Sequence, residues 1–185
     1  MPWGEKMQVT VVYSSKYGST KRYAEELHRR HPGALLELKD FRPKSLRGDV
    51  VVFFAPIYAF GLLNLSTLER DISRMQGKKV AIFCVGASNY NKKEFRRLYR
   101  HHFDGPLKDV PAFYGRGAWQ RDKMTRMDKV LLRLNYQTIK NKHKDKLQPW
   151  EEEFLTIYGK NWDWVDFSYL DALEEWLKAR DPFDD

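Results

Sequence analysis

Cysteine and long apolar runs are scarce in this 185-residue sequence, and each scarcity excludes a class of protein. The single cysteine, Cys84, cannot form an internal disulfide, which suits a reducing compartment. The longest apolar run, residues 50–63, is broken by a proline and a glycine and falls short of the roughly 20 residues that a membrane helix needs. The opening MPWGEKMQ lacks the apolar core of a signal peptide. We therefore expect a cytoplasmic protein.

Glycine is also scarce where a nucleotide-binding loop would need it. The stretch SSKYGST, residues 14–20, holds one glycine between the apolar run VTVVY and a helix-like segment. The usual dinucleotide and nucleoside-triphosphate loops are therefore unsupported. The position still suits a phosphate, because free N–H groups and the positive end of a helix dipole meet there. Two interpretations stay open, a phosphate loop that uses Gly18 for close backbone approach, or an ordinary helix start capped by Thr20.

Apolar runs of strand length alternate with segments of helical period, which is typical of βαβ units and a parallel sheet. The expected strands are residues 8–14, 34–40, 49–56, 79–86 and 110–117. The expected helices are residues 21–31, 66–75 and 91–103, with a closing helix within residues 162–180. With 42% hydrophobic residues the chain can bury one substantial core, so we expect a single domain over residues 1–185. The pattern predicts an α/β doubly wound sheet with ligands at the carboxyl ends of its strands.

Two further loops are expected at the same edge of the sheet. The loop after the third strand reads APIYAFGLLN and offers aromatic rings and backbone amides. The loop after the fourth strand reads VGASNYN and combines small polar residues with an aromatic ring. Each alone is compatible with an ordinary packed turn. Together with the first loop they indicate a phosphorylated planar cofactor such as FMN.

These three loops and the order of elements resemble the flavodoxin family, whose phosphate loop has the form S-x-x-G-x-T. The resemblance implies a five-stranded parallel sheet of order 2-1-3-4-5 and an FMN site, with the redox chemistry carried out by the flavin rather than by a catalytic side chain. The phosphate would be held by Ser15, Lys16, Tyr17, Gly18, Ser19 and Thr20. The isoalloxazine would lie between a loop of Pro56, Ile57, Tyr58, Ala59, Phe60 and Gly61 and a loop of Gly86, Ala87, Ser88, Asn89, Tyr90 and Asn91.

A narrower resemblance lies downstream, in AFYGRGAWQRDKMTRMDKVLLRL from Ala112 and in NWDWVDF from Asn161. These segments look like the branch that includes the menaquinone-dependent protoporphyrinogen oxidases. The resemblance implies an FMN-dependent oxidoreductase with a small-molecule substrate and a quinone acceptor. Two alternatives remain, a basic flavodoxin that carries single electrons between redox proteins, and a non-redox binding module on the same fold.

A basic segment interrupts the pattern between the fifth strand and the last helix, at about residues 117–160. Residues 116–146 carry 10 Lys+Arg against 3 Asp+Glu, within a chain of net charge +8. From Lys123 to Lys140 the residues Met124, Met127, Val130, Leu131 and Leu134 recur at helical spacing and predict an amphipathic helix.

We expect this apolar stripe to pack on the sheet beside the cofactor, and the alternative is that it lies on an anionic membrane, at the inner face. An acidic redox protein is a further candidate partner. Nucleic acid is disfavoured because no recognisable nucleic-acid module accompanies the charge. His28 with His31, and His101 with His102, lack the companions that a zinc site needs, so no metal is expected.

Overall fold

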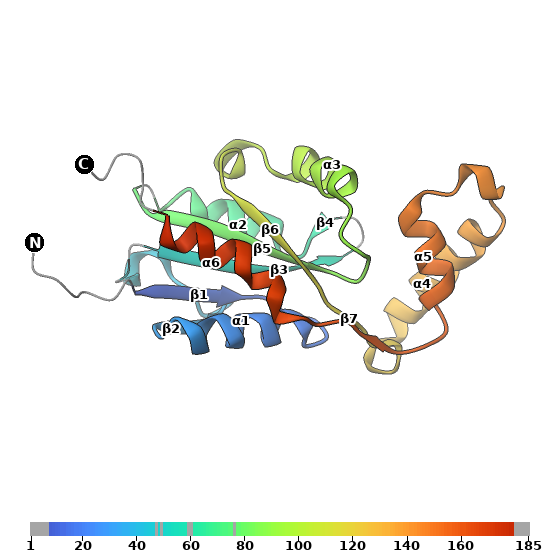
Figure 1. Ribbon diagram of the computed structural model, residues 1–185, viewed down its shortest axis with the longest axis horizontal. Coiled ribbons are helices and arrows are strands. Elements are labelled where there is room, and N and C mark those ends of the chain that lie inside the picture. The colour runs from blue at the N-terminus through green and yellow to red at the C-terminus, as the bar shows by residue number, and fades with distance from the viewer. Residues whose placement is uncertain (1–7, 47, 49, 59–60, 76, 180–185) are drawn as a thin grey trace, which may run out of the picture.

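The computed structural model describes residues 8–46, 48, 50–58, 61–75 and 77–179. Its centre is a parallel sheet of order β2-β1-β3-β5-β6, with the short β4 paired antiparallel to β3 (Figure 1). Counted without β4, these strands have the predicted order 2-1-3-4-5. Their bounds are β1 Val9–Tyr13, β2 Ala34–Glu37, β3 Val50–Tyr58, β4 Gly61–Leu62, β5 Lys79–Gly86 and β6 Ala112–Arg116.

Alternate residues of the central strands enter two separate cores, which is why these strands read as nearly continuous apolar runs. On one face, residues such as Val11, Val52 and Phe83 pack beneath α1 (Ser19–Arg30) and α6 (Asp171–Lys178). On the other, Val12 and Ile82 pack beneath α2 (Leu65–Ile72) and α3 (Lys92–His102). Cys84 is fully buried in this second core. The predicted doubly wound α/β fold is confirmed.

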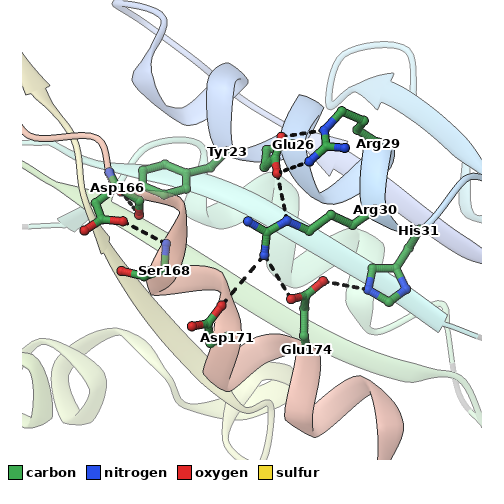
Figure 2. A network of polar contacts seen from close by, with 9 residues as sticks. All are labelled: Tyr23, Glu26, Arg29, Arg30, His31, Asp166, Ser168, Asp171 and Glu174. Atoms are coloured by element: carbon green, nitrogen blue, oxygen red, sulfur yellow. Dashed lines mark hydrogen bonds and ion pairs between the residues drawn. The ribbon is translucent and has the colours of Figure 1, made fainter.

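A network of ion pairs joins α1 to α6 on the outside of the first core (Figure 2). The Arg30 guanidinium bridges Glu26 of its own helix, at 2.8 Å, and Glu174 of α6, at 2.9 Å. His31 approaches the other oxygen of Glu174 at 2.9 Å. Because one arginine serves two helices that are far apart in the sequence, the network holds the last helix against the first.

The predicted insertion follows β6 and lies beyond the carboxyl ends of the strands (Figure 1). It contains the helices α4 (Arg126–Lys140) and α5 (Pro149–Ile157), and a short antiparallel pair, β7 (Ala118–Trp119) with β8 (Trp162–Asp163), closes its base. Gln148 and Glu151 form a capping box at the start of α5. Single 3-10 turns occupy Pro43–Ser45, Gly105–Leu107, Arg121–Lys123, Lys144–Lys146 and Phe167–Leu170. None of the helices in the described ranges is both long and apolar enough to cross a membrane.

One expectation about the insertion is wrong. The apolar stripe of α4 does not pack on the sheet, because Met127, Val130, Leu131 and Leu134 are all exposed and only Met124, before the helix, is buried. The face of α4 that turns to the protein carries Asp128 and Ile139 instead, at 5% and 4% exposure. The insertion thus stands off the sheet and rests on a different side of the helix from the one that hydropathy favours.

Candidate functional site at the carboxyl edge of the sheet

The first loop, residues 14–20, enters α1 through a left-handed glycine. Gly18 adopts a left-handed conformation with φ of 100°, and its N–H donates to Ser15 Oγ at 3.1 Å. The carbonyl of Gly18 accepts the first α1 hydrogen bond, from Arg22 N–H at 3.1 Å. Among the described residues no protein acceptor meets the N–H groups of residues 19–21. Three unpaired donors at the positive end of a helix attract an anion.

The predicted helix cap at Thr20 is wrong. Helix α1 begins at Ser19 with Gly18 as its N-cap, and Thr20 is already helical and 2% exposed. The reason is the positive φ of Gly18, which turns the chain into the helix without a side-chain cap. Of the three hydroxyls considered as donors, Ser15 and Ser19 lie at the loop surface and Thr20 is withdrawn into the protein. A Cβ atom added at Gly117 would come 3.1 Å from Ser19 Oγ, so the chain between β6 and β7 passes close to this loop.

A cavity of about 410 Å³ adjoins the first loop. Ser15, Gly18 and Lys21 line it, together with Asn64 at the start of α2. The Asn64 side-chain amide donates to Ser14 Oγ at 2.9 Å. Lys39 contributes a second ammonium, which is paired with Glu37 at 2.5 Å. The loop therefore opens onto a polar, partly basic cavity.

The second loop is shorter than expected, because β3 continues through Tyr58 and returns as β4. Pro56 and Ile57 are strand residues, and Gly61 is the first residue of β4. The predicted ring-flanking residues Ala59 and Phe60 lie outside the described residues. The Tyr58 ring lies beside the first loop, with Lys16 Nζ 3.9 Å from the ring centroid.

The polar groups of the third loop are held by two residues that sequence reasoning did not select. Arg116 of β6 donates to the Ala87 carbonyl at 3.0 Å and to Asn89 Oδ1 at 2.7 Å, and it pairs with Glu153 of α5 at 2.5 Å. Glu153 in turn accepts from Asn89 N–H at 2.9 Å. The third loop is thus tied to both the sheet and the insertion.

Aromatic side chains also contact the third loop. Burial raises the pKa of Tyr114, so its hydroxyl stays protonated and donates to the Ser88 carbonyl at 2.5 Å. The Tyr90 ring packs 5.6 Å from Tyr114 between centroids and is nevertheless 51% exposed. Asn91 caps α3 by accepting from the N–H groups of Lys93 and Glu94. The loop therefore presents one open aromatic face, while the N–H of Asn89 is already engaged.

A carboxylate from α4 lies against the first two loops. Asp128 is 2.8 Å from the ammonium of Lys16 and accepts hydrogen bonds from the hydroxyls of Tyr17 and Tyr58. Burial alone would lower the pKa of Lys16, but its hydrogen bonds to Asp128 and Tyr58 outweigh burial and raise it, so the ammonium stays charged. One feature of the sequence could have pointed to Asp128 as the partner of these loops: it is the one acidic residue between Lys123 and Lys140.

A larger cavity of about 650 Å³ lies between the third loop, α3 and the insertion. Aromatic and aliphatic side chains dominate its lining, including Tyr90, Phe95, Trp119, Leu132 and Phe154. Its volume falls within the roughly 300–1,000 Å³ range of small-molecule sites. All of Gly86–Asn91 and Ile57 contribute to its wall.

The three loops therefore line two cavities rather than one. The smaller cavity touches the first loop at the end of β1, and the larger touches the third loop at the end of β5. Since β3 lies between β1 and β5 in the sheet, the Asp128 cluster at the end of β3 stands between them. A ligand that reached from one loop to the other would pass this cluster.

A comparison with known proteins shows which family the sequence matches. Residues 10–146 match the family described as flavodoxin domain, a region that runs from β1 through α4. Among solved structures, the Trp repressor binding protein from Bacillus subtilis is 20% identical, with 60% of this chain and 85% of that chain covered and a TM-score of 0.43.

Two flavodoxin structures are similar at the same level. A flavodoxin from the domain Archaea is 17% identical, with 63% of this chain and 88% of that chain covered and a TM-score of 0.40. A flavodoxin variant from Fusobacterium nucleatum, bound to flavin mononucleotide, is 14% identical, with 62% and 71% covered and a TM-score of 0.37. No curated protein matches the chain.

Proposed function

Because the chain belongs to the flavodoxin domain family, we propose that it binds FMN at the carboxyl edge of its sheet and acts as an FMN-dependent oxidoreductase. The observation that carries this proposal is the first loop, where Gly18 turns with positive φ and three N–H groups meet no acceptor within the described part of the protein. A terminal monophosphate suits such a turn, since hydroxyls and amides around one helix end can wrap it.

The described residues suit the two parts of FMN, its phosphate and its ring, at separate places. Ser15, Ser19 and the N–H groups of residues 19–21 would hold the phosphate. Tyr58, beside the first loop, and the half-exposed Tyr90 of the third loop would supply aromatic surface for the ring. The flavin, when bound, would supply the redox chemistry, and the protein would bind it, orient it and limit its contact with water.

The third loop would contribute shape more than hydrogen bonds. Its Asn89 N–H and side-chain oxygen are engaged with Glu153 and Arg116. A ring that lay against this loop would therefore meet the exposed face of Tyr90 and the apolar wall of the larger cavity. Buried apolar contact of this kind favours a planar ligand and leaves its orientation to few polar groups.

The finer part of the proposal concerns the substrate. The resemblance of residues 112–134 and 161–167 to the protoporphyrinogen oxidase branch supports a large, flat tetrapyrrole substrate with a quinone as acceptor. The aromatic cavity of about 650 Å³ beside the third loop is a compatible place for a flat organic molecule. It is formed partly by α4 and α5, so the insertion would take part in substrate binding.

Anaerobic assays of purified, FMN-loaded protein test this proposal. We expect the protein to oxidise protoporphyrinogen when a menaquinone analogue is supplied, and we expect Phe154→Ala in the larger cavity to raise KM. The matched variant Phe41→Ala alters an aromatic residue of the second core that packs on Phe53 and does not line the cavity, so it should lower stability without raising KM. Rapid electron exchange with a reductase but no turnover of protoporphyrinogen would identify a carrier instead.

A further inference from the structure

The outward side of α4 is the most unusual surface of the described chain. Five large hydrophobic side chains among the described residues are exposed, and four of them belong to α4. These are Met127 at 68%, Val130 at 54%, Leu131 at 46% and Leu134 at 61% exposure. Their spacing of three and four residues places them on one side of the helix, here called the outer face. Apolar surface gathered in this way marks an interaction site more often than scattered exposure does.

The helix is anchored by its other side, so the outer face is not exposed through loose attachment. Thr125 caps the helix by accepting from Asp128 N–H, and the Asp128 carboxylate is bound to the first two loops. Tyr136 stacks on Tyr158, after α5, with 4.1 Å between ring centroids. Leu132 and Ile139 line the larger cavity. These contacts hold the outer face toward solvent.

Basic residues flank the outer face along one side. At about 100° per residue, Arg126, Lys129 and Arg133 gather on a sector roughly 120° from the outer face, and the inner face occupies the remaining sector. The stretch that holds α4 is basic as a whole, with 10 Lys+Arg against 3 Asp+Glu in residues 116–146, while the acidic residues Glu151, Glu152 and Glu153 lie on α5. An apolar strip with a cationic flank is the pattern of a helix that lies in the interface of an anionic bilayer.

We propose that the outer face of α4 docks on an anionic membrane surface. Met127, Val130, Leu131 and Leu134 enter the boundary between headgroups and acyl chains, and the arginines on the flank meet lipid phosphates. The inner face of the same helix forms a wall of the larger cavity, so docking brings that cavity within about one helix diameter, roughly 10 Å, of the lipid. This contact does not depend on whether flavin is bound.

The charge around the outer face indicates whether lipid or a second copy of the chain covers it. A two-fold pairing of outer faces would bring the basic flanks of two insertions together, and like charges in an interface oppose association. An anionic lipid surface instead neutralises these charges. The structure therefore favours lipid, and self-association is an outcome that the experiment can detect.

Vesicle sedimentation tests the proposal with the full chain. We expect binding to phosphatidylcholine vesicles that contain about 30% phosphatidylglycerol, and little binding to pure phosphatidylcholine. The double variant Leu131→Asp/Leu134→Asp should bind the anionic vesicles at least about tenfold more weakly, because carboxylates would have to enter the interface. Both side chains are exposed, so circular dichroism and melting temperature should be unchanged.

The matched control is Lys178→Glu, which changes the net charge by the same two units at the end of α6, on the opposite side of the molecule from α4 (Figure 1). It should bind nearly as well as the wild type. Equal loss of binding in both variants would mean that net charge alone acts, and would overturn the proposal. Undiminished binding of the double variant would overturn it as well, as would dimerisation through the outer face without vesicle binding.

A local probe gives a second measurement. Cys84 is fully buried, so a cysteine placed by Leu131→Cys can be labelled selectively with an environment-sensitive dye. Its emission should shift to the blue on addition of anionic vesicles, while a dye attached through Lys178→Cys should not shift. A shift at both positions, or at neither, would contradict docking through α4.

Discussion

The carboxylate of Asp128 lies 2.8 Å from the ammonium of Lys16, although the two residues are 112 positions apart in the sequence. Lys16 belongs to the loop proposed to bind phosphate, and Asp128 to the insertion helix. The side chain of Asp128 is 6% exposed and that of Lys16 is 28% exposed, so solvent screens this pair only in part. The contact links the position of the insertion to the charge at the first loop.

This pair predicts how a change at Asp128 affects anion binding. In Asp128→Asn, Lys16 keeps its charge and loses the carboxylate that neutralises it, so FMN should bind roughly three- to tenfold more tightly at low salt. The free energy of unfolding should fall by about 1–2 kcal/mol, because charged hydrogen bonds to Asp128 become weaker ones. Fluorescence titration with FMN and urea unfolding measure the two effects.

Asp145→Asn is the control for this prediction, since it removes the same charge from an exposed carboxylate at 74% side-chain exposure. It should alter neither FMN affinity nor stability appreciably. The reverse change, Lys16→Met, should weaken FMN binding because it leaves Asp128 uncompensated near the phosphate. Weaker binding by a folded Asp128→Asn variant would argue against the proposed role of this pair.

Arg116 offers a prediction about the third loop. Its guanidinium joins Ala87, Asn89 and Glu153 and also lies 3.8 Å from the Trp164 ring centroid. Arg116→Ala should lower the free energy of unfolding by about 2–4 kcal/mol. The reason is that it leaves the Glu153 carboxylate, whose side chain is only 18% exposed, without its charged partner. Urea unfolding measures the loss, and hydrogen exchange at the Asn89 amide should become faster.

Arg116→Lys provides the comparison, because it retains the charge but cannot reach all three acceptors with one ammonium. It should recover part of the stability and little of the protection at Asn89. If Arg116→Ala left both stability and exchange unchanged, the third loop would owe its shape to other contacts.

The fold was largely predictable because its strands are buried on both faces. Continuous Val, Ile and Phe indicated β3 and β5 with bounds close to those observed, and the ends expected for the first and third helices, residues 31 and 103, lie one residue from those observed. The start of α1 was not predicted, since a residue's φ is not visible in the sequence and Thr20 is a good cap by type. The orientation of α4 was predicted wrongly, because hydropathy alone favoured burial of the apolar stripe that the structure exposes.

The candidate site was predicted less completely than the fold. The first and third loops follow β1 and β5 as expected, because the carboxyl ends of parallel strands share one edge. Asp128, Arg116 and Glu153 were missed, since their contacts join residues that lie tens of positions apart. Nothing in the local pattern around Arg116 distinguishes it from the basic residues of the insertion that follows.

The network between α1 and α6 predicts a dependence of stability on pH. Hydrogen bonds from Arg29 and then Arg30 lower the pKa of Glu26 from 4.5 to about 2 (Figure 2). A lowered folded-state pKa stabilises the protein above the unfolded value, and this stabilisation is lost as the pH falls from about 4.5 toward 2. Because Arg29 is largely exposed, the contribution should be about 1 kcal/mol or less.

Urea unfolding of wild type and Glu26→Gln at several pH values checks this contribution. The difference in free energy of unfolding between the two proteins should be largest near neutral pH and should shrink as the solution is acidified below pH 4.5. A difference that stayed constant down to pH 2 would show that the Glu26 side chain acts through packing rather than charge.

FMN binding by the first loop is the central claim, and a titration of three proteins tests it most directly. The wild type should quench FMN fluorescence and shift its visible spectrum, and Gly18→Glu should do neither, because a carboxylate and a strained backbone would replace the phosphate turn. Gly77→Glu imposes comparable strain at a second left-handed glycine, with φ of 76° and no atom near its Cβ position, so it should bind FMN like the wild type. Equal FMN affinity of Gly18→Glu and the wild type, or no binding by a folded wild type, would contradict the account.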